Sequence, residues 1–126
     1  MNGTATRLNE SGSLVVGMGD RKKTVAPSEI IYLAGDSNYS RLIRSRKPAV
    51  MVSITITKYE TILPDFIRVH KQYIVNPAFV KRLIPGDIHR NGAKIQLRNG
   101  KLLPVARRRF LKIQDQLLEL VKRAGN

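Results

Sequence analysis

The segment 66–77 constrains the fold more than any other part of the chain. At 66–70, Phe66, Arg68 and His70 alternate with the aliphatic Ile67 and Val69, and a period of two predicts a half-buried strand. Residues 73–75 form a second β-prone run. Lys71 and Gln72 lie between the two strands, where no apolar neighbour can satisfy a cation and an amide. Two strands therefore hold a polar turn at a fixed position, and such turns commonly carry binding residues.

Short apolar runs separated by turn residues predict several further strands along the chain. Asn91-Gly92 and Asn99-Gly100 are dipeptides typical of type I′ hairpins, and the residues between them alternate. They predict a three-stranded meander with an aliphatic inner face and a basic outer face. Strands are expected at 14–18, 30–33, 39–44, 80–84 and 102–105. Lys47-Pro48 is expected to break the strand 39–44, and residues 1–13 are expected to form a flexible tail.

Two segments favour helices. Ile56, Tyr59 and Leu63 lie at helical spacing in a segment that also has strand propensity, and Thr57 with Glu60 fits a capping box. Pro64 ends this segment, so we expect a short helix of about two turns. A second helix is expected from Phe110. Its broad apolar face would consist of Ile113, Leu117, Leu120 and Val121, with Leu111 and Leu118 at the edge of that face. Gly125 is placed to end the helix.

The length of 126 residues predicts one domain at 21–126, preceded at 1–20 by a tail and a possible first strand. No run of apolar residues is long enough to span a membrane. The chain has no cysteine, which excludes disulfides and the commoner structural zinc sites. A cytoplasmic location is therefore the default expectation.

Charge is the strongest global feature, because 23 Lys and Arg stand against 9 Asp and Glu and give a net charge of +14. A domain with so much self-repulsion commonly has a polyanionic partner. A surface charged only for solubility is the alternative. An anionic membrane fits less well, because no basic amphipathic helix dominates the chain. Nucleic acid is the leading partner class.

Arg107-Arg108-Arg109 stand at the front of the expected C-terminal helix, where cations oppose the helix dipole. A bound phosphate would relieve this conflict, and a solvated basic cap is the alternative. The polar turn and strand at 36–41 form a weaker cluster. Catalysis finds no support: His70 and His89 have no cysteine or carboxylate at metal-ligand spacing, and no triad or phosphate loop is visible. We therefore expect no enzyme, no cofactor, no metal site and no small-molecule substrate.

Several motifs then combine in one order along the chain. The motif that is most specific to one family is Phe66-Ile67-Arg68-Val69-His70-Lys71-Gln72-Tyr73-Ile74-Val75-Asn76. The accompanying motifs are 30–33 with Asn38-Tyr39, Leu63-Pro64, the Asn99-Gly100 hairpin and Leu103-Pro104-Val105-Ala106-Arg107-Arg108. Over about residues 22–115 the chain resembles the LytTR DNA-binding domain of bacterial transcriptional regulators. The resemblance implies a mainly β fold of stacked antiparallel sheets, with one short internal helix and a C-terminal helix.

The resemblance also implies sequence-specific binding of double-stranded DNA by loops that enter successive major grooves. The family positions that touch bases correspond to Ser40, Lys71 and Arg108. The residues expected on phosphates are Arg21, Lys22, Lys23, Asn38, Tyr39, Arg41, Gln72, Arg107 and Arg109. Such a regulator is expected to act as a pair on two half-sites, as the output domain of a two-component-type response regulator.

Three departures from the family pattern matter. Ala106 replaces a common serine and should have no binding role, and Gln72 replaces another serine, which changes its reach. Only some twenty residues precede the domain, too few for the receiver domain that most family members carry, so the chain is expected to be a stand-alone regulator or a fragment. The alternatives are a basic β module that binds RNA or the ribosome, against which the aromatic residues are few, and a protein-interaction module.

Overall fold

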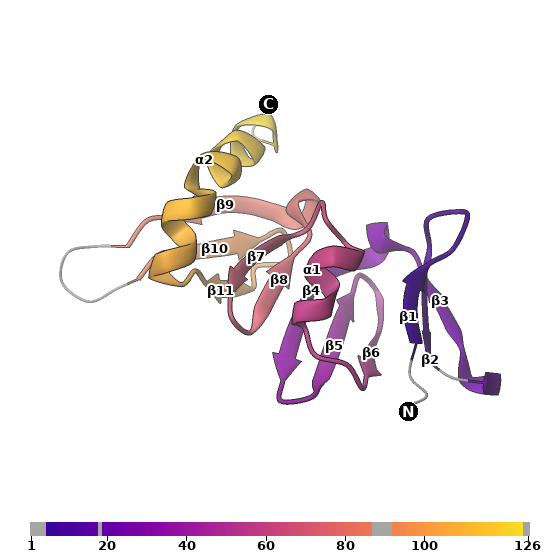
Figure 1. Cartoon of the computed structure of the whole chain (residues 1–126). Helices are drawn as coiled ribbons and strands as arrows, with labels where there is room; N and C mark the ends of the chain where they lie inside the picture. Colours follow the sequence, from indigo (N-terminus) through magenta and orange to yellow (C-terminus); the bar gives the residue numbers. More distant parts are fainter. Residues whose placement is uncertain (1–4, 18, 87–91, 125–126) are drawn as a thin grey trace.

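A computed structural model describes residues 5–17, 19–86 and 92–124 of the chain. The described residues fold into three antiparallel sheets and two α-helices, so the expected mainly β architecture is confirmed (Figure 1). None of the described helices has the length and apolarity that a membrane crossing requires.

The three sheets follow one another along the chain. The N-terminal sheet has the order β1-β2-β3, built from β1 (Ala5–Leu8), β2 (Leu14–Gly17) and β3 (Lys23–Val25). The central sheet has the order β6-β5-β4-β8-β7, built from β4 (Ile30–Asp36), β5 (Tyr39–Arg44), β6 (Lys47–Val52), β7 (Ile67–His70) and β8 (Tyr73–Val75). The C-terminal sheet has the order β11-β10-β9, built from β9 (Val80–Ile84), β10 (Lys94–Leu97) and β11 (Leu102–Pro104). The helices are α1 (Thr57–Ile62) and α2 (Arg107–Ala124), with 3-10 turns η1 (Gly19–Arg21), η2 (Pro27–Glu29) and η3 (Pro77–Phe79).

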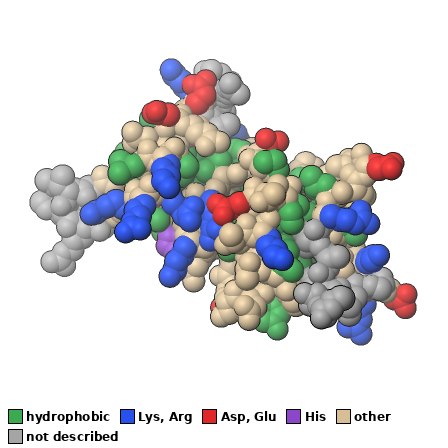
Figure 2. Space-filling view, viewed as in Figure 1, with side chains coloured by type: hydrophobic (Ala, Val, Ile, Leu, Met, Phe, Trp, Pro, Cys, Tyr) green, Lys and Arg blue, Asp and Glu red, His purple; other side chains and the backbone are tan. Residues whose placement is uncertain are grey.

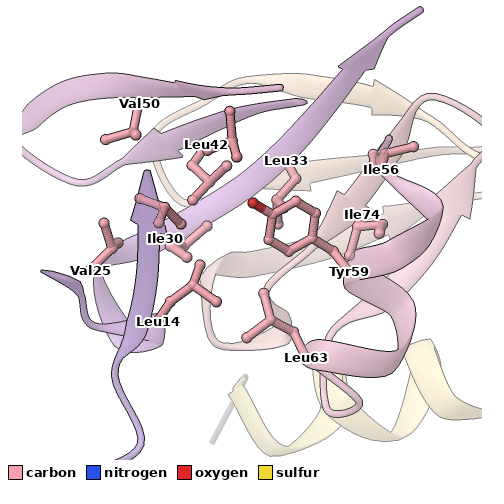
Figure 3. Packing of buried hydrophobic residues seen from close by; sticks show 12 residues of the cluster. Leu14, Val25, Ile30, Leu33, Leu42, Val50, Ile56, Tyr59, Leu63 and Ile74 are labelled. Atoms are coloured by element: carbon pink, nitrogen blue, oxygen red, sulfur yellow. The ribbon is translucent and has the colours of Figure 1, made fainter. Parts of the chain in front are cut away.

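The central sheet has an apolar cluster on each face. On one face, Leu33, Leu42 and Ile74 pack with α1 and the N-terminal sheet, as Figure 3 shows around the buried ring of Tyr59. On the other face, Ile31, Ile67, Val69 and Val75 belong to a cluster with the C-terminal sheet and Leu117 of α2. Because neighbours on a strand point to opposite faces, Ile74 and Val75 of β8 enter different clusters. The β7–β8 hairpin is therefore held from both sides.

The strands expected at 14–18, 30–33, 39–44 and 80–84 are confirmed as β2, β4, β5 and β9, except that Met18 lies outside the described residues. The expected meander of β9, β10 and β11 is confirmed too, with Ile95 and Leu97 buried on its inner face. The prediction of a flexible tail is wrong for residues 5–8, because these residues form β1 and pair with β2. The side chain of Asn9 closes that hairpin by accepting hydrogen bonds from the N–H groups of Ser11 and Ser13, each at 3.0 Å.

Two predictions about turns are wrong. The strand 39–44 ends as expected, but the break is the turn at 45–46, and Lys47-Pro48 opens β6. Because β6 is an edge strand, it tolerates a proline that cannot donate to a ladder. The Asn99-Gly100 turn is not of type I′, which needs positive φ at both residues, since only Gly100 has one, at 91°. Leu97 and Lys101 close it as a three-residue loop, with the N–H of Leu97 donating to the Lys101 carbonyl at 2.8 Å. Asn91, of the other predicted turn, lies outside the described residues.

Both helices are confirmed, with changed starts. The N-cap of α1 is Ile56 and no side chain caps it, so the predicted capping box is wrong and Thr57 and Glu60 have other partners. Helix α2 begins at Arg107, a turn before Phe110, and Leu117 is its fully buried residue. Gly125, expected to stop α2, lies outside the described residues.

Candidate nucleic-acid interface

The β4–β5 turn and the β7–β8 turn lie side by side at one edge of the central sheet. The N–H of Gly35 donates to the carbonyl of Gln72 at 2.8 Å. A hollow of about 430 Å³ opens between the two turns and the start of α1, and its lining includes Ser37, Thr57, Arg68 and Lys71. Two of the clusters that the sequence singled out are thus joined into one polar surface.

The β4–β5 turn presents Ser37 and Asn38 to solvent. The pairs Asp36–Tyr39 and Gly35–Ser40 flank it, so the loop has two residues. Ser37 has a φ of 54°, and primed hairpin turns require such a positive value. Two short polar side chains are thereby held at the tip of a tight hairpin, with Tyr39 exposed beside them.

Ser40 does not belong to this surface. Its side chain is fully buried, and its hydroxyl donates to the carbonyl of Ile54 at 2.8 Å. On β5 the alternation points Ser40 inward together with Leu42, while Tyr39 and Arg41 point outward. The expected base contact by Ser40 is therefore corrected: its hydroxyl is used within the fold.

The β7–β8 turn carries Lys71 and Gln72 in exposed positions. The guanidinium of Arg68 donates from Nη2 to the carbonyl of Lys71 and from Nε to the carbonyl of His70 at 3.2 Å. The N–H of Gln72 donates to Nδ1 of His70 at 3.1 Å. The turn's backbone groups are thus occupied within the protein, and the Lys71 side chain extends from a braced turn.

His70 is half-buried beside Tyr73, with their ring centroids 5.6 Å apart. Burial lowers the pKa of His70 below its ordinary value, and the cations Lys71, Arg109 and Arg68 lower it further. A neutral imidazole keeps the Nδ1 lone pair that accepts from Gln72. The local charge therefore favours the protonation state that the turn needs.

The start of α2 lies next to the end of β7. The N–H of Ala106 donates to the carbonyl of Val69 at 2.8 Å, one residue before the helix begins. Arg107 and Arg108 are exposed and Arg109 is partly buried. In Figure 2, Lys and Arg side chains gather over the start of α2 and the neighbouring hairpin, with an acidic side chain beside them. The third cluster thus joins the same edge.

Glu60 on α1 connects these elements. Its Oε2 lies 2.9 Å from Nη1 of Arg68, and its Oε1 lies 3.9 Å from Nη1 of Arg109. The hydroxyl of Thr57 accepts from the same Arg68 nitrogen at 3.1 Å. Arg68 therefore binds α1 and the Lys71 turn at once, and Arg109 is attached to the same carboxylate. Sequence analysis missed this role, because the alternation at 66–70 gives the face of Arg68 but not its partners.

The remaining expected contact residues lie on two parts of the surface. Arg41 is exposed on β5 near the first turn. Arg21, Lys22 and Lys23 are exposed on η1 and the beginning of β3, in the N-terminal sheet at the other end of the molecule from α2 (Figure 1). Among the described residues, no three His, Asp or Glu side chains are close enough to hold a metal ion.

Comparison with known proteins bears on the family and the fold. Residues 20–118 match the family described as the LytTr DNA-binding domain. A solved structure described as the "LytTr DNA-binding domain of putative methyl-accepting/DNA response regulator from Bacillus cereus" has the same fold, with a TM-score of 0.64 and 22% sequence identity over 94% of this chain and 98% of that one. A search of curated proteins finds no match.

Proposed function

Because the chain belongs to the LytTR family of DNA-binding domains, we propose that it recognises a particular sequence of double-stranded DNA with its turns. The family assigns it DNA binding and transcription regulation. The proposal concerns the reading mode: the β7–β8 turn and the start of α2 enter successive major grooves on one side of the duplex, and the β4–β5 turn follows the backbone.

One observation carries this proposal: two backbone hydrogen bonds join all three clusters. Gly35 to Gln72 joins the first turn to the second, and Ala106 to Val69 joins α2 to the strand that leads into the second turn. Groups that are fixed relative to one another before binding lose little entropy on binding. A rigid row of three clusters suits a rigid, periodic polyanion.

Arg108 and Lys71 are the proposed base-reading residues. Both are exposed, on neighbouring clusters of the joined surface, and both can donate to the O6 and N7 acceptors of guanine in the major groove. Arg108 ranks first, because its guanidinium can make both hydrogen bonds in one plane. Ser40 is excluded by its burial, and Ala106 has no polar side chain to offer.

The other cations are proposed to contact phosphates and set the register without reading sequence. Arg107 and Arg109 stand at the N-terminus of an 18-residue helix, where their charge opposes the dipole at a cost of about 0.3–1 kcal/mol each. A phosphate at this position would interact favourably with the helix N–H groups and with both guanidinium groups. Asn38, Tyr39, Arg41 and Gln72 are proposed backbone contacts nearby, and Lys22 and Lys23 are proposed contacts farther along the duplex.

A paired arrangement on two half-sites and a cytoplasmic location complete the proposal. RNA binding through stacked bases gains no support, because Tyr32 and Tyr73 pack edge to face with centroids 6.1 Å apart rather than forming an open platform.

The test is a selection from random duplex DNA with the purified chain, repeated with Arg108→Ala. We expect a defined sequence to emerge, and log affinity to fall with log salt at a slope equivalent to about five to eight phosphates. Arg108→Ala should cost about 1–3 kcal/mol on the selected duplex and much less on random duplex. Equal losses on both would reassign Arg108 to the backbone. Stronger binding to an RNA competitor would overturn the proposal.

A further inference from the structure

We propose that Glu60 is a positioning residue for sequence discrimination, holding the Lys71 turn and the start of α2 at a fixed spacing through two ion pairs. This inference rests on the proposed function, since discrimination between DNA sequences is what the spacing serves. Glu60 lies on α1, which carries none of the residues expected to contact DNA. Its role would be to fix the distance between reading groups, not to touch the duplex.

The two ion pairs differ in strength. The side chain of Arg68 is only 10% exposed and its contact to Glu60 is 2.9 Å, whereas Arg109 is 34% exposed and its contact is 3.9 Å. Arg68 also donates to Thr57 and to the Lys71 carbonyl, so its guanidinium can hardly move without moving the turn. The Arg109 pair is the weaker half of the bridge, and it favours one position of the first turn of α2 relative to α1.

The charge of Glu60 argues that the bridge serves discrimination more than affinity. The chain carries +14, and a carboxylate within its basic edge repels any phosphate that approaches. Glu60 also lies within ion-pair distance of Arg109, whose partly exposed guanidinium could otherwise bind a phosphate on any sequence. An acidic residue that weakens binding to all DNA, while holding Lys71 and Arg108 at the spacing of their bases, increases the ratio of affinities for the correct and the incorrect duplex.

The experiment compares Glu60→Gln with a matched control, Asp65→Asn. Asp65 is exposed just beyond α1, so its substitution makes the same charge change outside the bridge. Affinity is measured for the selected duplex and for random duplex with the same protein preparation, so that the folded fraction cancels in the ratio. Salt dependence is measured on random duplex for all variants.

Glu60→Gln should raise affinity for random duplex several-fold and steepen its salt slope by about one phosphate, because Arg109 becomes available to the backbone. The ratio of selected to random affinity should fall about tenfold, which is the size of one lost base contact. Asp65→Asn should leave the ratio unchanged. Glu60→Asp, which keeps the carboxylate, should retain more of the ratio than Glu60→Gln.

An unchanged ratio in Glu60→Gln, with both affinities moved alike, would overturn the positioning role and leave the proposed function standing. Equal ratios in Glu60→Gln and Asp65→Asn would reduce the effect to net charge and also overturn it. A wild-type ratio near one would overturn the proposed function and this inference with it.

Discussion

The N–H of Gly35 donates to the carbonyl of Gln72 at 2.8 Å, which binds the β4–β5 hairpin to the β7–β8 turn across the central sheet. A side chain at position 35 would interfere with this arrangement, since an added Cβ would lie 2.8 Å from Cγ2 and 3.0 Å from Cβ of Ile56. The close approach of strand and helix start depends on glycine for steric reasons, because the φ of Gly35 is not positive.

Gly35→Ala is therefore expected to lower the free energy of unfolding by about 1–3 kcal/mol through overpacking. It should also weaken binding to the selected duplex beyond the loss in folded fraction, because the strand that leads into the β4–β5 turn would shift away from the start of α1. Urea unfolding and DNA titration measure the two effects. Gly12→Ala provides a contrast, since a Cβ there meets no atom within 4 Å and its cost comes from a positive φ of 82° alone. Unaltered stability in Gly35→Ala would show that Ile56 yields freely.

Asn76→Ala is expected to cost about 1–3 kcal/mol of stability, because it removes three hydrogen bonds that a buried side chain makes with backbone groups. Asn76 is 6% exposed, and its Nδ2 donates to the carbonyls of Ile30 at 2.9 Å and Pro27 at 3.3 Å. Its Oδ1 accepts from the N–H of Ala78 at 3.0 Å. Thermal and urea unfolding would measure the loss. The exposed Asn38→Ala serves as the control and should change stability by less than about 0.5 kcal/mol.

Leu117→Ala and Leu118→Ala form a matched pair on α2. Leu117 is fully buried and Leu118 is 52% exposed, so only the first substitution creates a cavity. Leu117→Ala should destabilise the fold by about 2–5 kcal/mol, and Leu118→Ala by less than about 0.5 kcal/mol. Equal losses in urea unfolding would mean that α2 packs through another face.

The pH dependence of stability should contain a contribution from His70. Its pKa in the folded chain lies below 6.5, so the unfolded chain binds the proton first as the pH falls. The free energy of unfolding should therefore decrease as the pH falls from above 6.5 to below the folded-state pKa, and level off beneath it. His70→Gln should flatten the curve in this window. Urea unfolding between about pH 5 and 8 measures the difference, and parallel curves for both proteins would contradict the assignment.

Local patterns predicted the parts of the fold that short segments determine. The polar turn at Lys71 was predicted because alternation and β propensity indicate both of the strands that flank it. The same alternation, applied to 39–44, would have placed Ser40 on the inner face with Leu42; the resemblance to the family instead assigned it to the reading surface.

Contacts between distant segments were beyond the sequence patterns. Nothing near Glu60 indicates Arg109 as its partner, because the two come together only when α1 and the start of α2 converge beside β7. Strand β1 was missed for a similar reason, since its four residues are ordered by pairing with β2 rather than by a pattern of their own. Pro48 was expected in a break rather than a strand, because whether a proline ends a strand depends on whether that strand is at the sheet edge, which local sequence does not show.

The opposite burial of Ile74 and Val75 has a consequence for motion. Strand β8 belongs to two apolar clusters at once, so opening either one alone leaves it held by the other. Its amide protons should therefore exchange with deuterated water more slowly than those of the edge strands β6 and β11. The turn that presents Lys71 would stay ordered through partial unfolding of either end of the molecule.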